Sequence, residues 1–185
     1  MKTNIEKELT EKSKSIYHDY GHFAIEFEQL TLSIKICIFT LFGLQGLKDF
    51  KYLRVILHDQ TAYPLVNKLR SLLALHYEND AERYKSLDKL FSYTIKIIEK
   101  RNDIIHGSFF VNSTEDGDLF KDKTGKFGIK PIEDKYDNIK FINYTTKVIL
   151  AKNSFDILNS YLHKDDKVFD QFFNSTKLEE LNIDK

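Results

Sequence analysis

Residues 81–106, with the sequence AERYKSLDKLFSYTIKIIEKRNDIIH, decide the fold class. Apolar side chains recur in this stretch at three- and four-residue steps, which is the spacing of one face of an α-helix. Asn79 and Asp80 precede it as suitable N-terminal caps, and Gly107 follows it as a residue that readily ends a helix. We therefore predict one long helix over residues 81–106. The positions on its repeating face are Leu87, Leu90, Phe91, Thr94, Ile98, Arg101 and Ile105.

Further helices are expected before this stretch. The segment Thr3–Glu6 has the spacing of a capping box, which predicts an N-terminal helix within residues 1–20 that Gly21 breaks. A second helix is expected over residues 23–44, and its second half is apolar nearly all round, which indicates burial on most sides. Two shorter helices are expected next, the second of them beginning near Pro64. Their apolar faces contain Phe50, Leu53 and Leu57, and then Leu65, Leu69, Leu72 and His76.

The pattern changes after Gly107. Between residues 108 and 143, short apolar pieces alternate with turn sequences, which predicts a small antiparallel β-hairpin or meander. A last long helix carries Val148, Ala151, Phe155, Leu158 and Leu162 at helical spacing. A short tail helix is expected within residues 165–185. The predicted fold is mainly α, an antiparallel bundle of four to five long helices with a β-hairpin insertion after the motif helix, in one domain over residues 1–185.

The composition is that of a globular chain with no excess of either charge. The 185 residues include 28 basic and 28 acidic side chains, so a surface that binds nucleic acid has to be local. Cys37 is the only cysteine, which excludes an intramolecular disulfide and favours a reducing compartment. The apolar run Ile34–Leu44 is too short to cross a bilayer, and the charged N-terminus lacks the apolar core of a signal peptide. We expect a cytoplasmic protein without membrane association.

The end of the long helix carries the residues with the clearest chemistry. Arg101 is a permanent cation that matches phosphate oxygens, and His106 can exchange protons near neutral pH. Asn102 lies four residues before His106, close enough on a helix to orient the imidazole. These three side chains predict cleavage of RNA that needs neither a metal nor a cofactor. Asp103 can pair with His106 instead, although a solvated position on the helix is favoured.

Two other arrangements of histidines are interpreted as structural. Arg70 and His76 repeat the spacing of Arg101 and His106, but the residues between them are apolar, so we assign this pair to the core. His18 and His22 have the spacing of a helical metal pair but no third ligand nearby, so no metal site is predicted. A solvated surface is favoured over phosphate guidance for four lysines of the predicted hairpin. They are Lys121, Lys123, Lys126 and Lys130.

The pattern Arg101–His106 resembles the signature of the HEPN family of small helical domains, in which an arginine, a polar residue and a histidine lie near the end of a helix. The order of helices around it, over residues 21–164, and the Gly107 that leads into a hairpin are also similar. Many HEPN members are metal-independent endoribonucleases of antiviral, toxin–antitoxin or CRISPR-associated systems, and others are inactive scaffolds. The resemblance implies a helical bundle that dimerises with both motifs facing one cleft.

Two functions are expected as alternatives. The first is a dimeric bacterial endoribonuclease of a defence or toxin system, acting on RNA and not DNA. In it, His106 accepts the proton of the ribose 2′-hydroxyl or gives one to the 5′-oxygen, while Arg101 stabilises the phosphate, leaving a 2′,3′-cyclic phosphate and a 5′-hydroxyl. The second is a non-catalytic module for dimerisation or interaction. A nucleotidyltransferase-type antitoxin that masks the cleft is a further expected partner.

Overall fold

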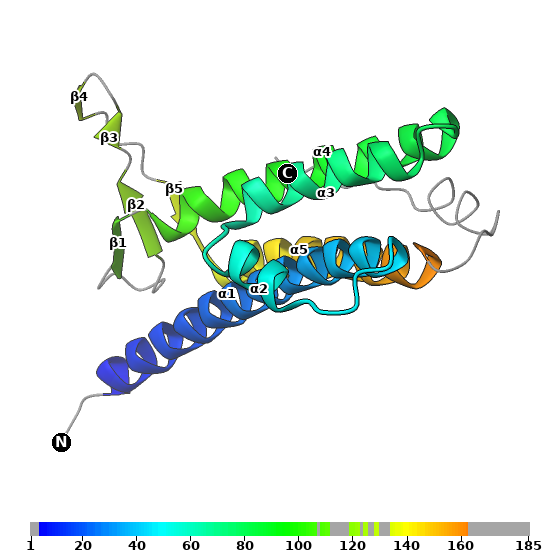
Figure 1. Cartoon of the computed structure of the whole chain (residues 1–185). Helices are drawn as coiled ribbons and strands as arrows, with labels where there is room; N and C mark the ends of the chain where they lie inside the picture. Colours follow the sequence, from blue (N-terminus) through cyan, green and yellow to red (C-terminus); the bar gives the residue numbers. More distant parts are fainter. Residues whose placement is uncertain are drawn as a thin grey trace.

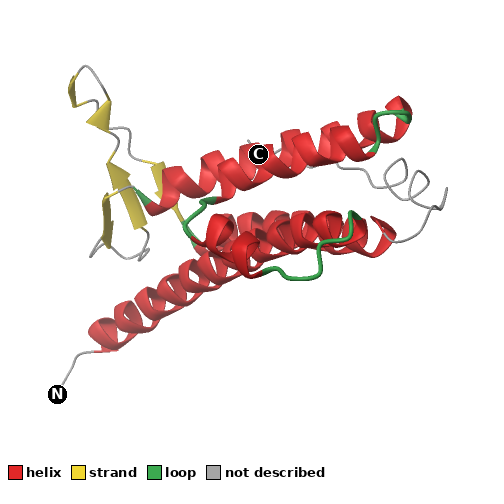
Figure 2. Ribbon diagram, in the orientation of Figure 1, coloured by secondary structure: helices red, strands yellow, loops and turns green. Residues whose placement is uncertain are grey.

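The computed structural model of the chain describes residues 4–106, 108–111, 119–122, 124–125, 128–129 and 134–162. Helices make up most of these residues, and short strands gather beyond one end of them (Figure 2). The mainly α, bundle-like fold predicted from the sequence is therefore confirmed. The helices are α1 (Asn4–Leu44), α2 (Lys51–His58), α3 (Ala62–His76), α4 (Ala81–Ile105) and α5 (Asn138–Leu162).

The predicted break near Gly21 is wrong, because α1 is one continuous helix of 41 residues. Phe23 and Phe27, just after the glycine, and Ile16, just before it, are all buried on the same side of the helix. Burial of each large apolar side chain contributes about 1.5–3 kcal/mol, whereas a glycine in a helix interior costs only about 1 kcal/mol. The packing of this face therefore outweighs the local preference of Gly21, and the predicted N-terminal helix of residues 1–20 is part of α1.

The helices lie in two layers, α1 beside α5 and α3 beside α4 (Figure 1), and α2 shares the lining of one cavity with α1 and α3. Helix α4 returns antiparallel to α3, as a short connection requires. Helices α1 and α5 run parallel, since Asn138 meets Asp19 at one end of the pair and Asn159 meets Thr40 at the other. The predicted antiparallel arrangement thus holds for α3 and α4 but not for α1 and α5. The parallel pair follows from α4, which carries the chain back to the end from which α1 departs.

The core lies between these layers. The faces predicted for α4 and α5 supply much of it, and the positions Val148, Ala151, Phe155, Leu158 and Leu162 of α5 are all buried. By length and composition, residues 13–44 of α1 could cross a membrane, but the core helix of a globular protein meets the same criteria. In this structure the apolar side of α1 packs on α3 and α5.

Short strands lie between α4 and α5. Strand β1 (Ser108–Val111) pairs antiparallel with β2 (Leu119–Asp122), which pairs with β5 (Asp134–Tyr136), while β3 (Thr124–Gly125) pairs with β4 (Gly128–Ile129). The connection over residues 112–118 lies outside the described residues, so the predicted hairpin stays a prediction. Its predicted boundary at residue 143 is wrong, because α5 begins at Asn138. The predicted tail helix of residues 165–185 also lies outside the described residues.

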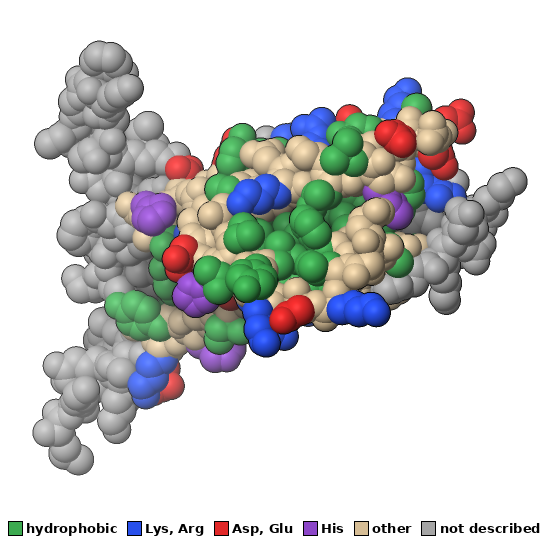
Figure 3. Space-filling model, viewed as in Figure 1, with side chains coloured by type: hydrophobic (Ala, Val, Ile, Leu, Met, Phe, Trp, Pro, Cys, Tyr) green, Lys and Arg blue, Asp and Glu red, His purple; other side chains and the backbone are tan. Residues whose placement is uncertain are grey.

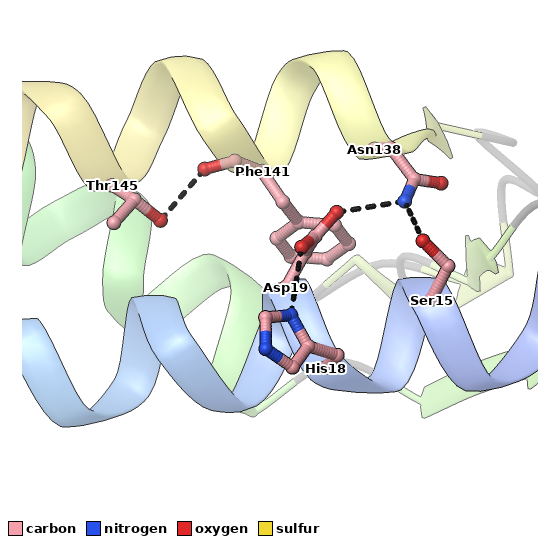
Figure 4. Close-up of polar contacts among 6 residues, drawn as sticks. All are labelled: Ser15, His18, Asp19, Asn138, Phe141 and Thr145. Carbon is pink, nitrogen blue, oxygen red and sulfur yellow. Dashed lines mark hydrogen bonds and ion pairs between the residues drawn. The ribbon is translucent and has the colours of Figure 1, made fainter.

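A polar junction fixes the start of α5 on α1. The side-chain amide of Asn138 donates to Ser15 Oγ and to Asp19 Oδ2, each at 2.7 Å, and His18 Nδ1 lies 3.2 Å from Asp19 Oδ1 (Figure 4). Phe141, one turn further along α5, is fully buried. The junction therefore sets the parallel register of α1 and α5 at the end of the bundle where α4 terminates.

Aromatic rings brace the same end of the bundle against α4. Tyr136, the last residue of β5, is 1% exposed and packs near Phe141 and Tyr144. The ammonium group of Lys100 lies 5.5 Å from the ring centre of Tyr136 and 5.1 Å from that of Tyr144. Burial alone would lower the pKa of Lys100, but hydrogen bonding and charge from these two tyrosines outweigh it and raise the pKa. The residue immediately before Arg101 is thereby anchored to the strands and to α5.

Candidate active site

The three residues predicted from the sequence line one cavity of about 420 Å³. Arg101 and Asn102 occupy the last turn of α4, and His106 is the residue that ends it, with its backbone N–H donating to Asn102 O at 3.0 Å. The volume lies within the range of about 300–1,000 Å³ that small-molecule clefts occupy. The fold thus brings all three side chains to a single hollow.

Arg101 is held by three neighbours. Its guanidinium carbon lies 5.1 Å from the ring centre of Phe27, and its Nη2 lies 3.6 Å from Glu28 Oε1, both on α1. Its Nη1 donates to Asn102 Oδ1 at 3.3 Å. The side chain is 24% exposed and lines the cavity, while the Phe27 ring supports the guanidinium. The cation is oriented in advance and accessible.

Asn102 differs from its predicted role. Its side-chain oxygen accepts from Arg101, and within the described part of the chain no hydrogen bond links it to the His106 ring. The helix places residues four apart on neighbouring positions, but the guanidinium next to Asn102 is the stronger donor. Asn102 therefore positions the arginine. His106 lines the cavity and is exposed, and Asp103 is exposed but does not line the cavity.

The cavity lining also contains residues to which no sequence pattern pointed. Thr31 and Lys35 come from α1, and His58 and Asp59 from the end of α2 and the loop after it. The Nδ1 atom of His58 lies 2.7 Å from Asp59 Oδ1. These residues are far from Arg101 in sequence, and no spacing connects them with it. An adjacent His-Asp pair at a predicted helix end is the one local signal that points to them.

Charges of both signs surround the cavity. Lys35 and Arg101 are its cations, Glu28 and Asp59 its anions, and histidines lie at both sides. Figure 3 shows the same mixture, with histidines grouped near the end of the bundle that adjoins the strands, beside acidic and basic side chains. A phosphate in this cavity would meet Arg101 and Lys35 directly but would also be repelled by Glu28.

Another cavity of the protein is largely apolar. It measures about 580 Å³, lies between α1, α2 and α3, and is lined largely by apolar side chains such as Phe42, Leu53 and Ile56. Figure 3 shows hydrophobic side chains gathered over the middle of the face in view. Its lining holds no histidine and no carboxylate, so it has no group for acid–base chemistry near neutral pH.

The Arg70 and His76 pair does not form a site. Arg70 Nη2 lies 2.9 Å from Asp88 Oδ1 on α4. His76 lines another cavity with Leu72 and Leu75 and lies against the ring of Tyr77. Burial, followed by the charge of Arg83, lowers the pKa of His76. The two side chains serve separate packing roles, as their apolar surroundings in the sequence predicted.

The remaining candidates of the sequence do not join the cavity. His22 Nε2 lies 3.7 Å from Glu26 Oε1, and His18 contacts Asp19. Among the residues that the structure describes, no group of three or more histidine, cysteine or acidic side chains could hold a metal ion. The side chains of the four predicted hairpin lysines, Lys121, Lys123, Lys126 and Lys130, lie outside the described residues.

Comparisons with models of protein families, with curated proteins and with solved structures found no match for this chain. The functional interpretation consequently depends on the geometry and chemistry of the cavity at the end of α4.

Proposed function

We propose that this chain is a HEPN-type, metal-independent endoribonuclease with a composite active site at a homodimer interface. The observation that carries the proposal is that Arg101, Asn102 and His106 line one cavity at the end of α4. A fixed arginine, a solvent-accessible histidine and a cavity of nucleotide-binding size are the elements that transesterification of RNA requires.

In the proposed reaction, the Arg101 guanidinium binds the non-bridging oxygens of the scissile phosphate and stabilises the charge that develops on them. His106 takes the proton of the ribose 2′-hydroxyl, whose oxygen then attacks phosphorus. The bond to the 5′-oxygen breaks and that oxygen takes up a proton, which gives a 2′,3′-cyclic phosphate and a 5′-hydroxyl end. DNA is not a substrate because it has no 2′-hydroxyl. Asn102 acts through Arg101 by holding its Nη1.

An apolar stripe on α1 supports the proposed homodimer. Ile25, Leu32 and Ile36 recur at helical spacing on its outer side and are 59%, 55% and 39% exposed. The cavity residues Glu28 and Lys35 lie on the neighbouring row of the same helix. A two-fold axis on this stripe pairs identical surfaces and places the cavity of one copy beside that of the other.

The proposed biological setting is a bacterial defence or toxin system in the cytoplasm. A single buried cysteine, Cys37, is compatible with a reducing compartment. In such a setting, a nucleotidyltransferase-type antitoxin is the proposed partner that covers the cavity until cleavage is needed.

The test is cleavage of single-stranded RNA in the presence of EDTA by the wild-type protein and by His106→Ala and Arg101→Ala. Removal of the base or of the phosphate ligand is expected to lower the rate by about 100-fold or more. Arg70→Ala and His76→Ala are the matched controls, because they repeat the motif spacing away from the cavity. Cleavage that requires a divalent metal, or that persists in both motif variants, overturns the proposal.

A second function is favoured by two contacts of Arg101. The Glu28 carboxylate and the Phe27 ring already occupy two sides of Arg101, as in a structural ion pair. In a non-catalytic interaction module, Arg101→Ala would weaken self-association, and neither the wild type nor the variant would cleave RNA. Parallel measurements of sedimentation and cleavage on the same samples separate the two functions.

A further inference from the structure

We propose that His58 is the second proton-transfer group of this cavity, acting as the general acid while Asp59 positions its ring. This inference rests on the proposed ribonuclease function. His58 lines the cavity together with His106 and Arg101, although it comes from a different part of the fold. Each copy would then contribute both a base and an acid to the proposed composite site at the dimer interface.

The backbone around His58 is anchored by buried neighbours on both sides. It is the last residue of α2, directly after Leu57, which is 3% exposed. The short loop that follows leads into α3, whose first residue Ala62 is also buried. Because the chain is anchored at Leu57 and Ala62, His58 and Asp59 project from a constrained turn over the cavity.

Asp59 determines which ring nitrogen can react. The Nδ1 of His58 lies 2.7 Å from Asp59 Oδ1, and a carboxylate oxygen only accepts hydrogen bonds, so Nδ1 is the donor. The nitrogen left for proton exchange is Nε2. When the ring is protonated, the same contact is an ion pair. A carboxylate on the far nitrogen of a histidine both orients the ring and accompanies its charge during proton transfer.

The chemistry of RNA cleavage needs two groups in opposite protonation states. One takes the proton of the 2′-hydroxyl as its oxygen forms a bond to phosphorus. The other gives a proton to the 5′-oxygen as its bond to phosphorus breaks. In the proposed division of roles, His106 takes the proton, and His58, whose ring Asp59 orients through Nδ1, gives one. After one turnover the two histidines have exchanged protonation states, and solvent restores both.

If the His58–Asp59 pair were merely structural, its removal would not change the rate of cleavage. The two side chains are 82% and 92% exposed, and exposed ion pairs add little to stability. Their removal should leave folding unchanged, which makes substitutions here clean to interpret. His18 and Asp19 form a matched pair with an Nδ1–Oδ1 distance of 3.2 Å, and neither residue lines the cavity.

The experiment uses two RNA oligonucleotides of the same sequence. One is all-oxygen, and the other has sulfur in place of the 5′-bridging oxygen at the bond that the wild-type protein cleaves. A thiolate leaves without receiving a proton because a thiol is far more acidic than an alcohol, so the sulfur substrate does not need a general acid. Single-turnover rates are measured for the wild type, His58→Ala, Asp59→Asn, His106→Ala and the control His18→Ala.

We expect His58→Ala to cleave the all-oxygen RNA about 100-fold more slowly or worse, and the sulfur-containing RNA within about threefold of the wild-type rate. Asp59→Asn should show a smaller loss, about tenfold, on the all-oxygen RNA alone. His106→Ala should lose both activities, and His18→Ala neither.

Three outcomes count against the inference. If His58→Ala cleaves the all-oxygen RNA at the wild-type rate, the role of His58 is overturned while the proposed ribonuclease function stands. If His58→Ala loses both substrates equally, it is not the general acid. If the wild-type protein cleaves no RNA at all, the proposed function itself is overturned, and the role of His58 is overturned with it.

Discussion

The guanidinium of Arg101 lies over the ring of Phe27, with 5.1 Å between its central carbon and the ring centre. An aromatic face holds a cation without neutralising it, so Phe27 supports Arg101 and leaves its charge unchanged. The Glu28 carboxylate, 3.6 Å from Nη2, is the one group described around Arg101 that competes with an anion for that charge.

Glu28→Gln is expected to tighten the binding of RNA. It removes a negative charge from the cavity and releases Arg101 Nη2, and exposed ion pairs of this kind amount to about 0.2–1 kcal/mol, or about 1.4- to fivefold in affinity. Fluorescence anisotropy of a labelled oligonucleotide measures the effect, and high salt should reduce it. Glu11→Gln is the control, because Glu11 is an exposed carboxylate near the N-terminal end of α1. Unchanged or weaker binding by Glu28→Gln would show that Glu28 does not oppose the ligand.

Leu32→Asp is expected to weaken self-association at least about tenfold, because it places a charge in the middle of the apolar stripe of Ile25, Leu32 and Ile36. Sedimentation velocity over a concentration series measures the change. Leu75→Asp, at a position 70% exposed on α3, provides a control of equal chemistry on another surface. Equal association by both variants would place any dimer interface elsewhere.

Gly21→Ala is expected to stabilise the protein by about 0.4–1 kcal/mol, because alanine has the higher helix propensity and restricts the unfolded chain. A Cβ at this position would meet no atom within 4 Å. Gly46→Ala is the opposite control, since Gly46 has a φ of 89° that side chains rarely adopt, and a loss of about 1 kcal/mol is expected. Urea unfolding measures both. Destabilisation by Gly21→Ala would contradict a continuous α1.

His76 is expected to make the protein less stable as the pH falls. Burial, and then Arg83, lowers the pKa of His76 in the folded protein below its ordinary value of 6.5. The unfolded chain therefore binds a proton first, and the stability present above pH 6.5 is lost as the pH falls through the lower, folded-state pKa. His76→Gln should lack this part of the dependence. Unfolding curves of the wild type and of His76→Gln are measured at about pH 7.5 and at about pH 5.5. An equal loss of unfolding free energy in both proteins at the lower pH would exclude His76 as a cause.

The sequence predicted which segments are helical better than where each helix begins and ends. In α4 and α5, long repeating apolar faces pointed correctly to the core, and Asp80 caps α4 by accepting from the backbone of Arg83. At Gly21 the local signal failed because distant packing on both sides of it decides the conformation. At the start of α5, Ile139 and Ile142 suggested a strand, since branched residues favour strands. The helix prevails there because it buries Phe141.

The cavity was predictable on one side only. Arg101, Asn102 and His106 belong to one helix end, so spacing alone related them to one another. His58 and Lys35 reach the cavity because α1, α2 and α4 converge there, and a single sequence contains no local pattern for that convergence. The contact of Asn102 with Arg101 likewise depends on side-chain geometry that spacing leaves open.

The elements that line the cavity differ in how well they tolerate amino-acid substitutions. One wall consists of turns of α1 and α4 whose other faces form the core, so substitutions there also disturb folding. The other contains the loop of Asp59, Gln60 and Thr61, which joins α2 to α3. Loops accept insertions and replacements far more readily than packed helices. Substitutions at Gln60 and Thr61 can therefore change what enters the cavity, while Asp59 and the arginine and histidine at the end of α4 keep their places.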